Sequence, residues 1–102
     1  MALNKLVVSP AAQGDFKEIY QYGCTHWGKK RALQYVSQLK EQLWQLLTHP
    51  EIGLLRSELS PTMRSFALEK HIIFYRVQSE QIEVVRLLHG RQDPVRQLTA
   101  SS

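Results

Sequence analysis

The stretch HIIFYRVQSEQIEVVRLLH, residues 71–89, decides the fold because it places two apolar runs around a short polar turn. Both runs are rich in β-branched and aromatic residues, which favour extended strands. Residues 78–80 separate them, so we predict a β-hairpin, although the turn lacks the favoured Asn-Gly or Asp-Gly pair. Simple alternation then places four residues of the second strand on one face: Ile82, Val84, Arg86 and Leu88.

A third strand is predicted just before this hairpin. The segment MRSFALE, residues 63–69, alternates in polarity and places Phe66 and Leu68 on one face. Residues 54–62 are predicted to form an irregular connector. At the other end of the chain, LNKLVV, residues 3–8, is rich in β-branched and apolar residues and predicts a short N-terminal strand.

Two helices are predicted between the first strand and the connector. Ser9 and Pro10 form a helix start, because serine caps helices and proline suits the first helical position. Asp15 and Glu18 follow in the earlier half of this helix, where carboxylates are favourable. Gly28 links it to a second helix, which ends before residue 50. Apolar residues of the second helix recur at intervals of three and four: Ala32, Val36, Leu39, Leu43, Leu46 and Leu47.

The second helix has a wide apolar band, since Leu33, Tyr35 and Trp44 extend it. We therefore expect this helix to contact both the first helix and the sheet. The resulting order is β-α-α-β-β-β, an α+β fold in which an N-terminal helical hairpin packs on one face of a small, mainly antiparallel sheet. Residues 1–98 are expected to form a single domain and residues 99–102 a short flexible tail.

The composition is that of an ordinary globular protein, with 43% apolar and 22% charged residues among 102. No apolar run approaches the ~20 residues of a membrane span, and the N-terminus lacks a secretory signal pattern, so a cytoplasmic location is expected. Cys24 is the only cysteine, which excludes an internal disulfide and a thiolate metal cage. Because the histidines are scattered and no phosphate-binding glycine loop occurs, we expect no metal and no cofactor.

Positive charge is unevenly distributed along a chain whose formal net charge is +4. Lysine dominates the first half and arginine the second, and arginine binds carboxylates and phosphates through paired hydrogen bonds. The second half is therefore the predicted recognition half. Its candidate partner-binding residues are Arg64, Arg76, Arg86, His89, Arg91 and Arg96. Lysines and an arginine also open the second helix at residues 29–31, an unfavourable end for cations, and we interpret them as a solvated turn rather than as a contact for an acidic target.

Arg86 stands out because apolar residues flank it on both sides in its strand. A cation in such a strand must reach the sheet edge or bind a carboxylate. Two kinds of partner fit this requirement. One is an internal carboxylate, from Glu58, Glu69 or Asp93, and the other is an acidic segment of a binding partner that folds over the chain.

Four segments together resemble the ParE toxins of the RelE/ParE superfamily: SPAAQGDFKEIYQY, YVSQLKEQLWQLLTHPEIG, MRSFALEKHIIFYRV and IEVVRLLHGRQDP. The resemblance runs from Ser9 to about Pro94. It implies the same order of helices and strands and a toxin of a type II toxin–antitoxin system, of the kind that stabilises plasmids or chromosomes. Such a toxin is expected to inhibit bacterial DNA gyrase by binding it. It is also expected to form a hetero-oligomer with a ParD-like antitoxin whose C-terminal segment is acidic, without membrane contact or sequence-specific nucleic-acid contact.

RelE-type members of the same superfamily cut messenger RNA on the ribosome, so ribonuclease activity is the alternative function. Here His89 could serve as acid or base, Arg91 and Arg64 could hold phosphate, and Tyr75 could supply a hydroxyl. However, the isoleucines at 72–73 stand where such nucleases carry an arginine, and the tail after Arg91 lacks their terminal tyrosine or histidine. These departures favour a non-catalytic toxin in which Tyr75 is a core residue and His89 a strand-end histidine.

Overall fold

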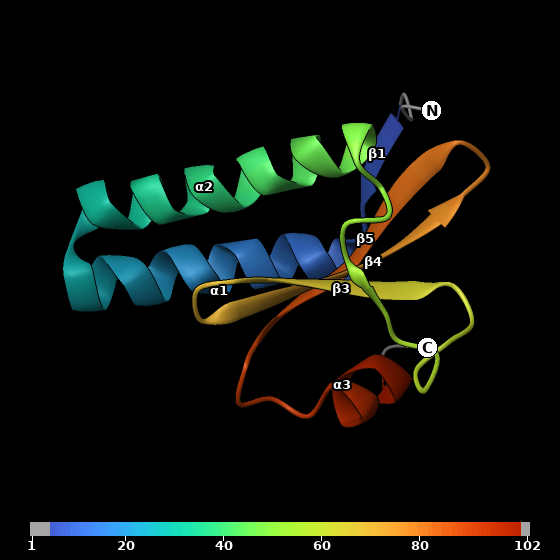
Figure 1. The fold of residues 1–102 in the computed structure, drawn as a ribbon. Helices are drawn as coiled ribbons and strands as arrows, with labels where there is room; N and C mark the ends of the chain where they lie inside the picture. The colour runs from blue at the N-terminus through green and yellow to red at the C-terminus, as the bar shows by residue number, and fades with distance from the viewer. Residues whose placement is uncertain (1–4, 101–102) are drawn as a thin grey trace.

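The computed structural model describes residues 5–100, which contain one five-stranded sheet in the order β1-β5-β4-β3-β2 (Figure 1). The strands are β1 Lys5–Val8, β2 Leu54–Leu55, β3 Met63–Leu68, β4 His71–Gln78 and β5 Gln81–His89. β1 pairs with β5 in parallel, and every other neighbouring pair is antiparallel. The N-terminal strand therefore lies beside the last strand of the chain.

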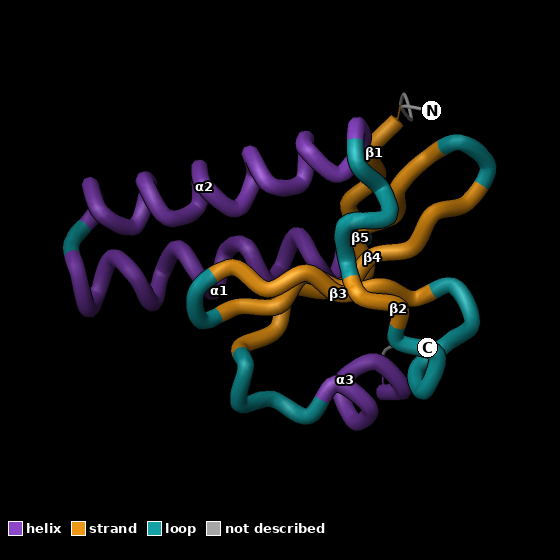
Figure 2. Tube along the Cα trace, viewed as in Figure 1, coloured by secondary structure: helices purple, strands orange, loops and turns teal. Residues whose placement is uncertain are grey.

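Three helices accompany the sheet: α1 Pro10–Trp27, α2 Lys29–Thr48 and α3 Pro94–Ala100. α1 and α2 form an antiparallel hairpin on one side of the sheet, whereas α3 packs on the other side (Figure 1 and Figure 2). The predicted α+β fold, with a helical hairpin on one face of a mainly antiparallel sheet, is confirmed. Among residues 5–100, none of the helices combines the length and the hydrophobicity that a membrane crossing requires.

The predicted order lacks two elements, β2 and α3. β2 has two residues, both exposed, so no alternation of polarity could mark it. α3 begins at Pro94, and Asp93 accepts a hydrogen bond from Val95 N at 3.1 Å. This Asp-Pro pair is a helix-start signal that the sequence does contain. α3 runs to Ala100, so half of the expected tail is helical; residues 101–102, and residues 3–4 of the predicted first strand, lie outside the described residues.

A bulge in β5 corrects the predicted faces of that strand. Consecutive residues of β4 pair with Val84 and Arg86, so Val85 is an extra residue between them. The alternation shifts by one position beyond the bulge. Leu87 therefore joins Val84 in the cluster beneath the helical hairpin, whereas Leu88 lies in the cluster on the opposite face. The prediction that one face carries every second residue from 82 to 88 is wrong beyond the bulge.

The larger core lies between the helical hairpin and the sheet. Leu39, Leu43 and Leu46 of α2 are at most 2% exposed, which confirms the predicted apolar stripe. Phe66 and Leu68 of β3 both pack against this core, so their shared face is also confirmed. Trp44 and Leu33 are different: they are 61% and 48% exposed, and their predicted contact with the core is wrong.

The helical hairpin closes through a single residue, Gly28. Its φ of 92° lies in the region that favours glycine, and this conformation lets the chain reverse direction between two helices. Gly23 brings the helices close together, because a Cβ there would lie 2.9 Å from the Cβ of Ala32. At the linked end of the two helices, Trp27 packs edge-on against Tyr35, with ring centroids 5.8 Å apart.

Candidate partner-binding surfaces

Asp15 of α1 joins the helical hairpin to β5. It accepts hydrogen bonds from Arg86 Nε at 2.7 Å, from Arg86 Nη2 at 2.9 Å and from Leu87 N at 2.9 Å. Because β1 pairs only with residues 81–84 of β5, Asp15 occupies the edge of β5 beyond the reach of β1. The side chains of Asp15 and Arg86 are 9% and 15% exposed, so the pair is well shielded from solvent. The bond to Asp15 raises the pKa of the Arg86 guanidinium.

This ion pair decides between the two kinds of partner considered for Arg86. The partner is an internal carboxylate, but it is none of the three expected ones, since it comes from α1. Glu58 instead pairs with Arg56 at 2.7 Å. Asp15 lies in the earlier half of α1, as predicted, and the structure adds that its side chain is buried against β5.

A groove of about 1100 Å³, here called the polar groove, opens beside this ion pair. It lies between the linked ends of α1 and α2 and the end of the sheet formed by the β3–β4 turn and the last residues of β5. Its cationic and aromatic side chains are Arg31, Lys70, Arg91, Tyr22, Trp27 and Tyr35. His89 and Arg91 are the predicted partner-binding residues that line it.

Two histidines form the floor of the polar groove. His71 and His89 are cross-strand partners at the ends of β4 and β5, with ring centroids 5.5 Å apart. The hydroxyl of Tyr35 lies 2.6 Å from His71 Nδ1, and His89 Nδ1 accepts a hydrogen bond from Arg91 N at 3.1 Å. Each imidazole is therefore held by its Nδ1. Burial lowers the pKa of His71, and the neighbouring His89 lowers it further.

We expect His71 to make the folded state less stable in mild acid. Because the unfolded chain has an ordinary histidine pKa of about 6.5 and the folded pKa is lower, the unfolded state takes up the proton first as the pH falls below about 6.5. Asp15 acts in the opposite direction and Lys70 in the same direction as burial, but the net shift is downward. Thermal melts should show a steeper fall in Tm between about pH 7.5 and about pH 5.5 for the wild type than for His71→Gln. His49→Gln, at an exposed position, should keep the wild-type profile, and a wild-type profile in His71→Gln would contradict this account.

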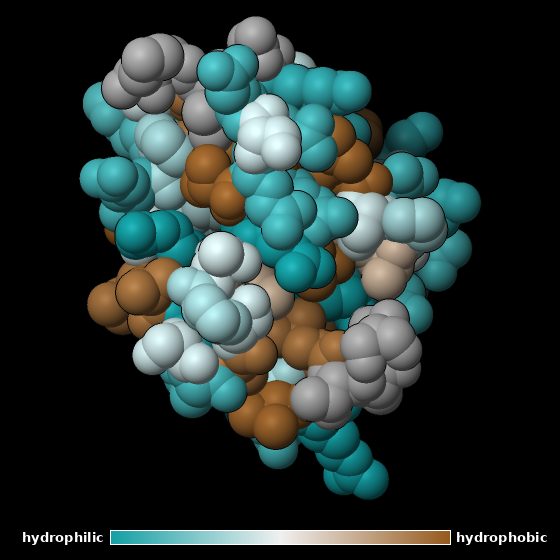
Figure 3. Space-filling model, turned by 90° about the vertical axis from the view of Figure 1, so that its right-hand side faces the viewer, coloured by the Kyte–Doolittle hydropathy of each residue, from teal (hydrophilic) through white to brown (hydrophobic). Residues whose placement is uncertain are grey.

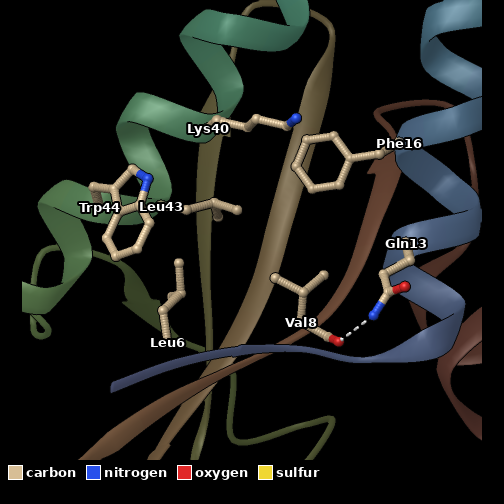
Figure 4. Close-up of a pocket in the computed structure, with 7 residues that line it drawn as sticks. All are labelled: Leu6, Val8, Gln13, Phe16, Lys40, Leu43 and Trp44. Atoms are coloured by element: carbon tan, nitrogen blue, oxygen red, sulfur yellow. Dashed lines mark hydrogen bonds between the residues drawn. The ribbon is translucent and has the colours of Figure 1, made fainter. Parts of the chain in front are cut away.

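A second groove, here called the apolar groove, lies at the other end of the helical hairpin and has a volume of about 420 Å³ (Figure 4). It is lined by Leu6, Val8, Gln13, Phe16, Lys40, Leu43 and Trp44. Figure 4 shows β1 crossing its floor while α1 and α2 form its walls. Gln13 Nε2 donates to the Val8 carbonyl at 3.1 Å, and Lys40 Nζ lies 5.9 Å from the Phe16 ring centroid. The exposed Trp44 belongs to this groove.

The other predicted partner-binding residues lie away from both grooves. Arg64 Nη1 donates to the Gly53 carbonyl at 2.8 Å, and Arg76 forms a half-buried ion pair with Glu83 at 2.6 Å. Arg96 lies exposed on α3. The structure therefore divides the six candidates: three bind within the chain, two line the polar groove and one lies on α3.

Exposed apolar side chains also lie in β2 and just before it. Ile52, Leu54 and Leu55 are 55%, 74% and 51% exposed. On the face drawn in Figure 3, hydrophobic atoms are interspersed with hydrophilic ones and are most abundant in the lower half. The hydrophobic surface of the molecule is therefore not confined to the apolar groove.

Apart from His89 and Arg91, sequence reasoning did not identify the residues that build the two grooves. Trp44 and Phe16 were assigned to helix stripes, although Trp44 falls four residues after Lys40 and so shares its side of α2. Lys70 sits in a β-turn far along the chain from Arg31, and only the sheet topology brings them to one groove. No local signal could have paired them.

Comparison with known proteins agrees with this architecture. A family model described as "ParE toxin of type II toxin-antitoxin system, parDE" matches residues 6–94. The protein named Toxin ParE1 of Mycobacterium tuberculosis is 36% identical over 96 residues, which cover 93% of this chain and 98% of that one. Toxin ParE of Escherichia coli is 27% identical over 92 residues and 89% of each chain.

Solved structures give the same picture. A chain of the "Chromosomal ParDE TA system from P. aeruginosa" superposes with a TM-score of 0.75 at 25% identity, covering 85% of this chain and 96% of that one. A mutant of the E. coli toxin RelE superposes with a TM-score of 0.67 at 19% identity, over 99% of this chain and 97% of that one, and shows the shared fold. A helical hairpin on a five-stranded mixed sheet is thus the architecture of the small RelE/ParE-like toxins. Within that class, the chain belongs to the ParE toxin family of type II toxin–antitoxin systems.

Proposed function

We propose that this ParE toxin acts in the cytoplasm by binding and inhibiting bacterial DNA gyrase, and that a ParD-like antitoxin neutralises it in a tight hetero-oligomer. The observation that carries this proposal is the family match over residues 6–94. It is supported by similarity to proteins named ParE, which extends over most of their length. The RelE-like fold by itself supports neither target, since one fold can serve different functions.

The partners of the residues considered for catalysis support binding rather than RNA cleavage. The Tyr75 hydroxyl is buried, donates to the Pro50 carbonyl at 2.8 Å and accepts from Gly53 N at 2.9 Å. Arg64 donates to the Gly53 carbonyl in the same region. His89 closes the loop after β5 through Arg91 N and, by its own backbone N, through Gln92 Oε1 at 2.7 Å. The Tyr75 hydroxyl and the Arg64 guanidinium thus have structural partners, and His89 Nδ1 is engaged within the loop.

The apolar groove suits an antitoxin segment that carries both apolar and acidic side chains. Its floor and walls are hydrophobic, with Leu6, Val8 and Phe16 among them, and Lys40 supplies a cation at its rim. β1 forms the outer edge of the sheet there, since it pairs only with β5 among the described residues. Trp44, a residue type that often dominates binding energy, extends over the groove from α2. The remaining contacts that we propose for partners involve His89, Arg91 and Arg96.

Replacing Trp44 by alanine should separate the two activities. Removing a tryptophan from the centre of an interface commonly costs 2 kcal/mol or more, so Trp44→Ala should raise the Kd for the antitoxin by about 30-fold while leaving inhibition of gyrase unchanged. Leu33→Ala, an exposed residue of the same helix outside the groove, is the matched control and should change neither. Supercoiling assays with purified gyrase, with and without antitoxin, measure both effects.

Two results would contradict these proposals separately. If the wild-type toxin binds its antitoxin normally but leaves supercoiling untouched at micromolar concentration, gyrase is not the target. If Trp44→Ala binds the antitoxin as tightly as Leu33→Ala does, the apolar groove is not the docking surface. Codon-position cuts in translated messages, abolished by His89→Ala, would instead establish the ribonuclease alternative.

A further inference from the structure

The sheet topology gathers basic side chains from three separate segments at one end of the molecule. Lys29 and Lys30 precede Arg31 at the start of α2, while Lys70 lies in the β3–β4 turn and Arg91 follows β5. All five are exposed, and Arg31, Lys70 and Arg91 line the polar groove. We call these five residues the basic end. Figure 1 shows the α1–α2 link, the β3–β4 turn and the chain after β5 directed toward the same side of the molecule.

The three cations of α2 lie where they destabilise the helix. Positive charge is unfavourable at a helix N-terminus, and the first turn of α2 has no acidic residue to compensate. The N-cap is Gly28, which offers no side-chain hydrogen bond. Because these three cations act against the stability of their own helix, we expect them to have a role other than in folding.

The polar groove combines this charge with aromatic surfaces. Tyr22 is 58% exposed and stacks on His26 with ring centroids 3.8 Å apart. The ring centroid of Trp27 lies 6.1 Å from that of Tyr22. Of the three carboxylates that line the groove, Asp15 is bound by Arg86 and Leu87 N, which leaves Glu18 and Glu69 against the cations. At about 1100 Å³ the groove can hold more than a single small ligand, because such sites start near ~300 Å³.

We propose that the basic end and the polar groove bind a single-stranded nucleic-acid segment without sequence preference. The cations contact consecutive phosphates, and the exposed ring of Tyr22 stacks on a base. A positively charged groove with an aromatic platform is the arrangement that such segments require. The inference does not depend on gyrase as the target, since it concerns contacts made by the toxin alone.

Fluorescence anisotropy with a labelled oligo-dT of ~12 nucleotides tests the proposal, because such a strand can span several binding positions. Each neutralised phosphate contributes about −0.7 to the slope of log K against log salt, so five contacts predict a slope of about −3.5. The double variant Lys29→Glu/Lys30→Glu should lower affinity at least ~10-fold and flatten the slope by about 1.4, while its Tm stays at or above that of the wild type. Tyr22→Ala, which changes no charge, should lower affinity about fivefold or more.

Matched controls separate a binding site from general attraction. Lys5→Glu/Lys17→Glu changes the net charge by the same amount at exposed positions outside the basic end, and should keep wild-type affinity. An oligo-rU of the same length carries the same phosphate charge but has a 2′-hydroxyl and lacks the thymine methyl group. Stronger binding of either strand identifies the type of nucleic acid that the groove prefers and supports the proposal equally. No binding at low salt would overturn the proposal, as would equal losses in both double variants. Tighter binding of a duplex or of polyglutamate than of oligo-dT would also overturn it.

Discussion

Replacing Asp15 by alanine is expected to lower the free energy of unfolding by about 3 kcal/mol, because it leaves a shielded guanidinium without its counter-charge. Arg86 would lose both of its bonds to the carboxylate, and Leu87 N would lose its acceptor at the edge of β5. Breaking one partner of a buried pair costs about 3–5 kcal/mol, and the residual exposure of the two side chains places this pair at the lower end of that range.

Urea unfolding followed by circular dichroism measures this loss. Glu41→Ala, at an exposed position of α2, is the matched control and should change stability by less than ~0.5 kcal/mol. Asp15→Asn tests the charge alone, since the amide keeps the shape of the carboxylate and one oxygen acceptor. It should fall between the wild type and Asp15→Ala. If Asp15→Ala behaves like Glu41→Ala, the ion pair does not hold the helical hairpin on β5.

The second large effect is expected at Gly53, where alanine should cost about 2–4 kcal/mol. Gly53 is buried against Tyr75, whose hydroxyl both receives the Gly53 N–H and donates to the Pro50 carbonyl. A Cβ at Gly53 would lie 2.5 Å from the Tyr75 hydroxyl oxygen and 2.9 Å from the Ser65 carbonyl oxygen. Because Tyr75 is fully buried and the Ser65 oxygen belongs to the backbone, neither can move aside without disturbing the sheet.

Gly14 provides the opposite case within the same chain. Apart from its chain neighbours and the backbone of its own helix, a Cβ there meets no atom within 4 Å, and the residue lies inside α1. Gly14→Ala should therefore stabilise the protein by about 0.5–1 kcal/mol, since alanine loses less backbone entropy than glycine on helix formation. Denaturant midpoints of the two variants should move in opposite directions. A midpoint for Gly53→Ala at or above the wild-type value would show that the contact between Gly53 and Tyr75 is loose.

The sequence predicted those parts of the fold that rest on periodicity. The apolar stripe of α2 repeats over about four turns, and the hairpin from 71 to 89 has two long apolar runs, so periodicity predicts both. The bulge at Val85 could not be predicted in the same way, because one inserted residue leaves the composition of a strand unchanged while reversing its faces. β2 is too short to have a period at all.

The candidate surfaces were predictable to a smaller extent. His89 and Arg91, two of the predicted candidates, line the polar groove, whereas Arg86, for which an internal and an external partner were both considered, pairs with Asp15, 71 residues earlier. Trp44 was read as a core residue because helical spacing alone does not show where a sheet ends beside the helix. For Arg86 and for Trp44 alike, the decisive neighbour lies on another element, and no local pattern records it.

The pairing of β1 with β5 also affects when the molecule can form during its synthesis. Ser9 Oγ donates to the Val85 carbonyl across 76 positions of sequence, and Asp15 reaches Arg86 across 71. The helical hairpin emerges from the ribosome first, but these long-range contacts can close only after nearly the whole chain has been made. An incomplete chain therefore lacks β5, the strand on which the helical hairpin is anchored. The toxin can reach its folded state only at the end of translation.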